Sequence, residues 1–140
     1  MIKKIIIQLI FLKFLFPTNI DFNEEKVIKM MYEYFTSSKD STKLIGHRFY
    51  ESSGEMIFQL ELETNPRRVN EALIHGFNSI SKFSSLSKVH FTHSILVIHF
   101  EGNILPIIAE SNIRCLKRYF VQKRYNENQW RKNCLRIKSY

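Results

Sequence analysis

The sequence predicts an α+β fold in which an antiparallel sheet of two hairpins has its helices packed on one face, in the order α-ββ-α-ββ-α. Two pairs of strand-like segments, each joined by a short turn, predict the hairpins. Segments with helical periodicity lie before, between and after these pairs. With 140 residues, of which 44% are hydrophobic and 14% aromatic, and with only 4 Gly and 3 Pro, the chain has the composition of one folded domain.

The first predicted helix covers about residues 22–37. Asp21 and Glu24 have the spacing of a capping box at its start. Apolar side chains then recur at helical spacing, at Val27, Met30, Met31, Tyr34 and Phe35. Such a stripe is typical of a helix face that packs into a core.

The first predicted hairpin pairs Leu44–Tyr50 with Glu55–Glu63 around the connection Glu51–Gly54. In the second arm, four apolar side chains occupy alternate positions and therefore share one face: Met56, Phe58, Leu60 and Leu62. Glu61 and Glu63 lie on the opposite face, where we interpret them as solvated carboxylates rather than as a catalytic pair.

The second predicted helix begins at Asn65 and Pro66, which suit the N-cap and the first helical position. The clearest apolar stripe of the chain follows at three- and four-residue steps: Val69, Ala72, Leu73, Gly76, Phe77, Ile80 and Phe83. A glycine within such a stripe favours a close approach between the helix and the sheet. We therefore predict that Gly76 lies against a strand.

The second predicted hairpin pairs Val89–Phe100 with Ile104–Ala109. Pro106 lacks a backbone donor, so the second arm is predicted to be an edge strand. Ser111 is expected to cap a helix over about 112–125, and a short last helix is expected over about 129–138.

The N-terminal residues predict a separate role. We divide the chain into a hydrophobic leader or membrane anchor at 1–20, an α+β domain at 21–125 and a basic helical extension at 126–140. A positive start followed by the apolar run Ile5–Phe16 is typical of a secretory signal. Lys13 interrupts this run, and 12 residues reach only ~18 Å as a helix, less than the ~30 Å of a bilayer core. This segment therefore has three alternative interpretations: a leader or anchor, a buried element of the fold, and an interfacial helix in contact with a membrane. The sequence does not determine whether residues 1–20 are cleaved.

The positive charge is concentrated at the C-terminus. The net charge of the chain is +8, yet residues 1–110 hold 12 Lys and Arg against 12 Asp and Glu. Residues 111–140 hold 9 basic residues and only Glu127 as an acid. A segment with this imbalance favours an anionic partner: phospholipid headgroups, an acidic protein surface or RNA. Eight of these residues are our predicted binding residues: Arg114, Lys117, Arg118, Lys123, Arg124, Arg131, Lys132 and Arg136.

No motif in the sequence predicts catalysis, a metal site or a cofactor. His93 and His99 share a strand face but lie ~20 Å apart, too far to bind one ion together. Cys115 and Cys134 could form a disulfide only if the chain bends near 126–128, and the spacing alone leaves their pairing open.

Two functions are consistent with these observations. The first is a small exported or membrane-tethered, non-enzymatic interaction domain that is secreted or located at the cell envelope. The second is an RNA-binding subunit of an organellar or cytoplasmic ribonucleoprotein, in which Ile5–Phe16 is a buried element and the basic segment contacts phosphates.

Overall fold

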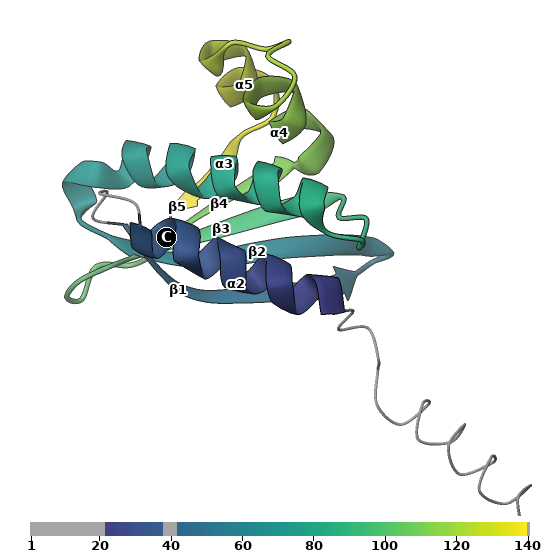
Figure 1. Cartoon of the computed structure of the whole chain (residues 1–140). Helices are drawn as coiled ribbons and strands as arrows, with labels where there is room; N and C mark the ends of the chain where they lie inside the picture. Colours follow the sequence, from purple (N-terminus) through teal and green to yellow (C-terminus); the bar gives the residue numbers. More distant parts are fainter. Residues whose placement is uncertain (1–21, 38–41, 140) are drawn as a thin grey trace, which may run out of the picture.

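The computed structural model describes residues 22–37 and 42–139, so the predicted leader at 1–20 lies outside the described residues. The helices and strands follow one another as α2 (Phe22–Ser37), β1 (Lys43–Ser52), β2 (Glu55–Thr64), a 3-10 turn at Pro66–Arg68, α3 (Val69–Leu86), β3 (His93–Phe100), β4 (Ile107–Asn112), α4 (Ile113–Phe120), α5 (Glu127–Asn133) and β5 (Arg136–Ser139). The α+β class is confirmed. Helices α2 and α3 lie side by side across the sheet (Figure 1), where α2 contacts β1, and α3 contacts β2 and β3.

The sheet is mixed, so the prediction of an antiparallel sheet is wrong at one position. Its five strands are ordered β1-β2-β3-β4-β5, and the neighbours pair antiparallel except for β2 and β3, which run parallel. The cause is α3, whose 18 residues span ~27 Å and bring the chain back along the ~33 Å of the 10-residue β2. The next strand therefore starts at the same end as β2 and runs beside it in the same direction.

Both predicted hairpins form. In the first, Ser53 and Gly54 have positive φ angles of 52° and 80°, as a two-residue turn between right-twisted strands requires. In the second, β3 pairs with β4 from His93 opposite Asn112 to Ile98 opposite Ile107.

Strand β4 is not the edge strand that Pro106 predicts. It lies between β3 and β5, and it begins at Ile107, so the missing donor of Pro106 falls just outside the strand. The helix after β4 is also capped by Asn112 instead of Ser111 and ends at Phe120.

The expected last helix over about 129–138 is wrong in its second half. Helix α5 ends at Asn133, and the chain continues as β5, which pairs with β4 through Ile108 opposite Lys138 and Glu110 opposite Arg136. A strand forms here because β4 offers an unpaired edge, and neighbouring backbone groups satisfy each other's hydrogen bonds.

The core lies between the sheet and helices α2 and α3. Its fully buried apolar side chains include residues from both helices, from β2 and β3, and from α4 and α5: Met31, Phe58, Leu60, Leu62, Phe77, Ile80, Leu96, Ile98, Leu116 and Trp130. Gly76 lies against the sheet, as its sequence position predicts. A Cβ at this position would lie 2.7 Å from Leu96 Cδ2 and 2.9 Å from Leu62 Cδ1.

This close approach predicts the result of substituting the glycine. We expect Gly76→Ala to lower the free energy of unfolding by about 1–2 kcal/mol, because overpacking the fully buried Leu62 and Leu96 costs more than the ~1 kcal/mol that alanine gains in helix propensity. Urea denaturation measures this change. Asn78→Ala, on the exposed side of the same helix, is the control and should change stability by less than ~0.5 kcal/mol. A stabilised Gly76→Ala protein would show that the helix and sheet are not in tight contact.

Candidate functional site

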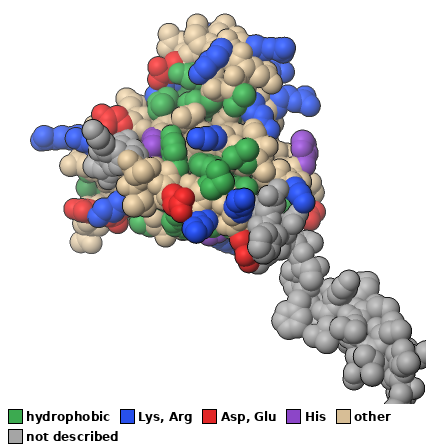
Figure 2. All heavy atoms as spheres, viewed as in Figure 1, with side chains coloured by type: hydrophobic (Ala, Val, Ile, Leu, Met, Phe, Trp, Pro, Cys, Tyr) green, Lys and Arg blue, Asp and Glu red, His purple; other side chains and the backbone are tan. Residues whose placement is uncertain are grey.

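The predicted binding residues are spread over one end of the molecule. Figure 2 shows Lys and Arg side chains projecting around the end formed by α4 and α5. Helix α4 carries Arg114, Lys117 and Arg118, the following turn carries Lys123 and Arg124, α5 carries Arg131 and Lys132, and β5 carries Arg136.

A buried tryptophan holds α4 and α5 against the body of the protein. Trp130 is 0% exposed, and its ring contacts Phe77 of α3 and Tyr119 and Phe120 of α4 at centroid distances between 5.3 and 5.6 Å. Its Nε1 donates a hydrogen bond to Ser111 Oγ (3.4 Å). Helix α5 is thereby anchored to the core, and the basic residues that it carries have defined positions.

The sequence does not determine whether the two cysteines pair, and in the structure they form a disulfide. Cys115 in the first turn of α4 is bonded to Cys134 at the end of α5, with a Cα–Cα distance of 5.9 Å. The bend that permits this pairing lies at 121–126, where Lys123 has a positive φ of 56° and the backbone N–H groups of Arg124 and Tyr125 both donate to Arg118 O. The disulfide therefore closes a loop that contains most of the basic residues.

Few of these cations are neutralised by the protein's own carboxylates. Arg131 Nε lies 3.1 Å from Glu127 Oε1, and Lys138 Nζ lies 3.6 Å from Glu110 Oε1. Among the residues that the structure describes, the remaining C-terminal cations make no ion pair with a carboxylate: Arg114, Lys117, Arg118, Lys123, Arg124, Lys132 and Arg136. The end of the molecule thus keeps an unneutralised positive charge.

Two of the predicted residues are engaged within the fold. Arg118 donates from Nη1 to the hydroxyl of Tyr125 (3.1 Å) and lies 5.7 Å from the centroid of that ring. Arg131 lies 5.9 Å from the centre of the Trp130 ring and donates to Asn70 Oδ1 (3.4 Å). These cations help to hold α5 and the preceding turn in place.

Arg114 and Lys117 are brought together in a hollow, which we call the Arg114 hollow. Its volume is about 260 Å³, and its lining comes from the segment before β3, from the start of α4 and from the turn after it: His90, Phe91, Thr92, Asn112, Ile113, Arg114, Lys117 and Gln122. None of these side chains is a carboxylate. The sequence does not predict that His90, Thr92 and Gln122 belong to this site. Only the tertiary structure places residues 90–92 beside α4, through a hydrogen bond from Ile113 N to Thr92 O (3.1 Å).

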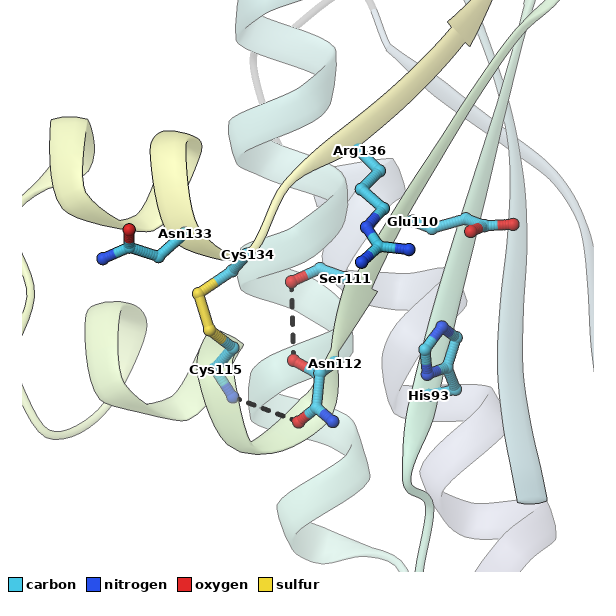
Figure 3. Close-up of a pocket in the computed structure, with 8 residues that line it drawn as sticks. All are labelled: His93, Glu110, Ser111, Asn112, Cys115, Asn133, Cys134 and Arg136. Carbon is cyan, nitrogen blue, oxygen red and sulfur yellow. Dashed lines mark hydrogen bonds between the residues drawn. A yellow bond between two sulfur atoms is a disulfide. The ribbon is translucent and has the colours of Figure 1, made fainter. Parts of the chain in front are cut away.

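Asn112 also lines another hollow. It has a volume of about 220 Å³ and is lined by His93, Glu110, Ser111, Asn112, Cys115, Asn133, Cys134 and Arg136. In Figure 3 the guanidinium of Arg136 points into this space between the disulfide and His93. Because Glu110 also lines it, this hollow carries both signs of charge and is less selective for anions.

The histidines of β3 pair with acids on the sheet face opposite α2 and α3. His93 Nδ1 lies 3.7 Å from Glu55 Oε2, and His99 Nε2 lies 3.3 Å from Glu61 Oε1. In the described ranges, 22–37 and 42–139, no three His, Cys, Asp or Glu side chains are grouped so that they could hold a metal ion. Since β2 and β3 are neighbours in the sheet, each of these histidines contacts a carboxylate across the strand pair.

A further titratable pair lies between α2 and β1. Tyr32 Oη and His47 Nδ1 are hydrogen bonded at 2.8 Å. Burial disfavours the charged forms, so it lowers the pKa of His47 and raises the pKa of Tyr32. Both groups are therefore uncharged at neutral pH, as suits a polar contact at the edge of a core.

None of the described helices is both long enough and apolar enough to span a bilayer. No known protein family matches this chain, and comparison with characterised proteins and with solved structures finds no match either.

Proposed function

We propose that this protein is an exported or membrane-tethered, non-enzymatic interaction domain that binds the anionic headgroups of phospholipids through the basic end formed by α4, α5 and β5. The observation that carries this proposal is the group of C-terminal cations, among them Arg114, Lys123 and Arg124, that have no carboxylate partner in the described residues. Unneutralised cations on one surface attract an anionic membrane by about 1 kcal/mol each.

The Cys115–Cys134 disulfide supports export. Disulfides form and persist in oxidising environments, such as the periplasm, the secretory pathway and the cell surface, and they are rare in the cytosol. The alternative is an RNA-binding subunit of an organellar or cytoplasmic ribonucleoprotein, and the disulfide favours the exported domain over the cytoplasmic form of that alternative.

The positions of the aromatic residues also favour a lipid surface over RNA. Sequence-tolerant binding of single-stranded RNA uses aromatic rings on which the bases stack. Trp130 is fully buried, and the ring of Tyr125 is occupied by Arg118. These two aromatic residues therefore support the fold, whereas exposed cations such as Arg114, Lys123 and Arg124 remain available for a charged surface.

Vesicle binding tests the proposal. The full chain is sedimented with phosphatidylcholine vesicles that do or do not contain phosphatidylserine, so that any binding through the apolar N-terminal residues appears in both. The test variant removes three exposed cations, Arg114→Gln, Lys123→Gln and Arg124→Gln. At about 1 kcal/mol for each cation, we expect the affinity for the anionic vesicles to fall about 100-fold.

The matched control removes three exposed cations from α2 and β1, through Lys26→Gln, Lys29→Gln and Lys43→Gln. We expect this variant to bind anionic vesicles with nearly the affinity of the unmodified chain. If both variants lose the same affinity for anionic vesicles, binding depends on the net charge of the protein and not on the basic end. The alternative would replace the proposal if the chain does not bind vesicles but does bind RNA. In that case the logarithm of the RNA affinity should fall with the logarithm of the salt concentration, with a slope of about −0.7 for each phosphate contacted.

A further inference from the structure

We infer that the Arg114 hollow is a binding site for a single phosphomonoester group, and that it selects such a doubly charged phosphate over a phosphodiester. The inference rests on the proposed function, because it narrows the chemistry of the anionic partner. Two cations and several neutral donors meet there, and no acid lines the hollow.

The cations of the hollow are free to bind a ligand. Arg114 is exposed and Lys117 is half-buried, and neither pairs with a carboxylate in the described part of the chain. The guanidinium offers a planar set of N–H donors that matches phosphate oxygens, and the ammonium adds a compact positive charge. Together they balance the charge of a phosphate dianion.

Neutral donors complete the lining. Asn112 Oδ1 already accepts hydrogen bonds from the backbone N–H groups of Arg114 (2.8 Å) and Cys115 (3.4 Å). These bonds cap α4, so the site consists of side chains and does not depend on the end of the helix. The amide NH₂ of Asn112 remains as a donor, and His90 and Gln122 contribute an imidazole and a second amide.

The hollow is held in shape from both sides. Thr92 N donates to Met56 O (3.0 Å), and Ile113 N donates to Thr92 O (3.1 Å), so the segment that carries His90 is tied to β2 and to the start of α4. Phe91 and Ile113, which are 4% and 3% exposed, form an apolar floor. Ion pairs are stronger next to such a floor than in open water, since the local dielectric constant is lower.

The volume indicates a small ligand group. At about 260 Å³, the hollow is smaller than the ~300–1,000 Å³ of sites for drug-sized ligands. It suits one phosphate group better than a run of polymer. At neutral pH a phosphomonoester carries a charge of about −1.5 to −2, whereas a phosphodiester carries only one negative charge. Arg114 and Lys117 therefore favour the monoester.

Two measurements on the full chain test this inference. The first titrates inorganic phosphate against chloride at constant ionic strength and follows the NMR signals of the His90 ring and the backbone of Arg114. The second compares vesicles that contain phosphatidic acid, a phosphomonoester, with vesicles of equal surface charge that contain phosphatidylserine. In the titration we expect the chemical shifts of His90 and Arg114 to change and to saturate with phosphate concentration. In the comparison we expect the affinity for phosphatidic acid vesicles to be well above the affinity for phosphatidylserine vesicles.

The decisive variants remove equal charge inside and outside the hollow. Arg114→Gln with Lys117→Gln should abolish the phosphate-dependent shifts of His90 and lower the affinity for phosphatidic acid, relative to phosphatidylserine, by about tenfold or more. Lys123→Gln with Arg124→Gln, at exposed positions outside the lining, should weaken binding to both vesicles and leave the ratio unchanged. Circular dichroism of both variants checks that they are folded.

The outcomes separate this inference from the proposed function. The inference is overturned, and the proposed function still stands, if the chain binds phosphatidic acid and phosphatidylserine vesicles with equal affinity. The same holds if both double variants change the ratio of these two affinities equally. Saturating shifts of His90 without any vesicle binding support the hollow, identify a soluble phosphate as its ligand and overturn the proposed membrane partner. The absence of phosphate-dependent shifts and of vesicle binding overturns both.

Discussion

Replacement of Trp130 by alanine is expected to lower the free energy of unfolding by about 3–5 kcal/mol, the range measured for large aromatic residues in cores. Trp130 is 0% exposed and contacts rings from two other helices, Phe77 of α3 and Phe120 of α4. Its removal leaves a cavity and also deprives Ser111 Oγ of the indole donor. Urea denaturation followed by circular dichroism measures the loss, because Trp130 is the single tryptophan and its fluorescence disappears with it.

Val121→Ala is the control for this prediction. Val121 follows α4 and is 54% exposed, so its truncation should change stability by less than ~0.5 kcal/mol. Trp130→Phe retains a ring but loses the Nε1 donor, and we expect a loss between those of the other two variants. A Trp130→Ala protein as stable as the Val121→Ala control would show that α5 is not part of the core.

Removal of the disulfide is expected to lower the free energy of unfolding by about 3 kcal/mol. The disulfide links residues 19 positions apart, and without it the unfolded chain regains the conformational entropy that this link removes. We expect Cys115→Ala with Cys134→Ala to unfold at a lower urea concentration than the oxidised protein. The unmodified chain should lose a similar amount of stability after reduction with dithiothreitol.

The double alanine variant is also the control for reduction, because dithiothreitol should leave its unfolding midpoint unchanged. Before reduction, a thiol titration of the folded chain purified from an oxidising compartment should detect no free cysteine. Two titratable thiols in that preparation would contradict the disulfide and would remove the support that it gives to export.

Both anchors also affect the proposed binding surface. Trp130 and the disulfide hold α5 and the turn after α4 in place, and Gln122 and Lys123 lie in that turn. Arg114 and Lys117 lie on α4, which Asn112 caps independently. Loss of the disulfide should therefore weaken binding to anionic vesicles more than it weakens binding of inorganic phosphate in the Arg114 hollow.

Local patterns in the sequence determined the elements whose causes are themselves local. The stripe from Val27 to Phe35 predicted α2, and Asn65 and Pro66 marked the start of the helical segment that leads into α3. The alternation in β2 predicted which side chains face the core, and the glycine in the α3 stripe predicted a close contact with the sheet. The concentration of positive charge after residue 110 is likewise a property of the sequence alone.

Only the tertiary structure decided the features that depend on residues far apart in the chain. The parallel pairing of β2 and β3 follows from the path of α3, and β5 forms because β4 offers an edge for Arg136–Ser139. The disulfide depends on the bend between α4 and α5, and the Arg114 hollow depends on the contact of residues 90–92 with α4. Periodicity records which face of one element is buried, but the choice of its neighbour depends on packing and hydrogen bonding across the whole chain.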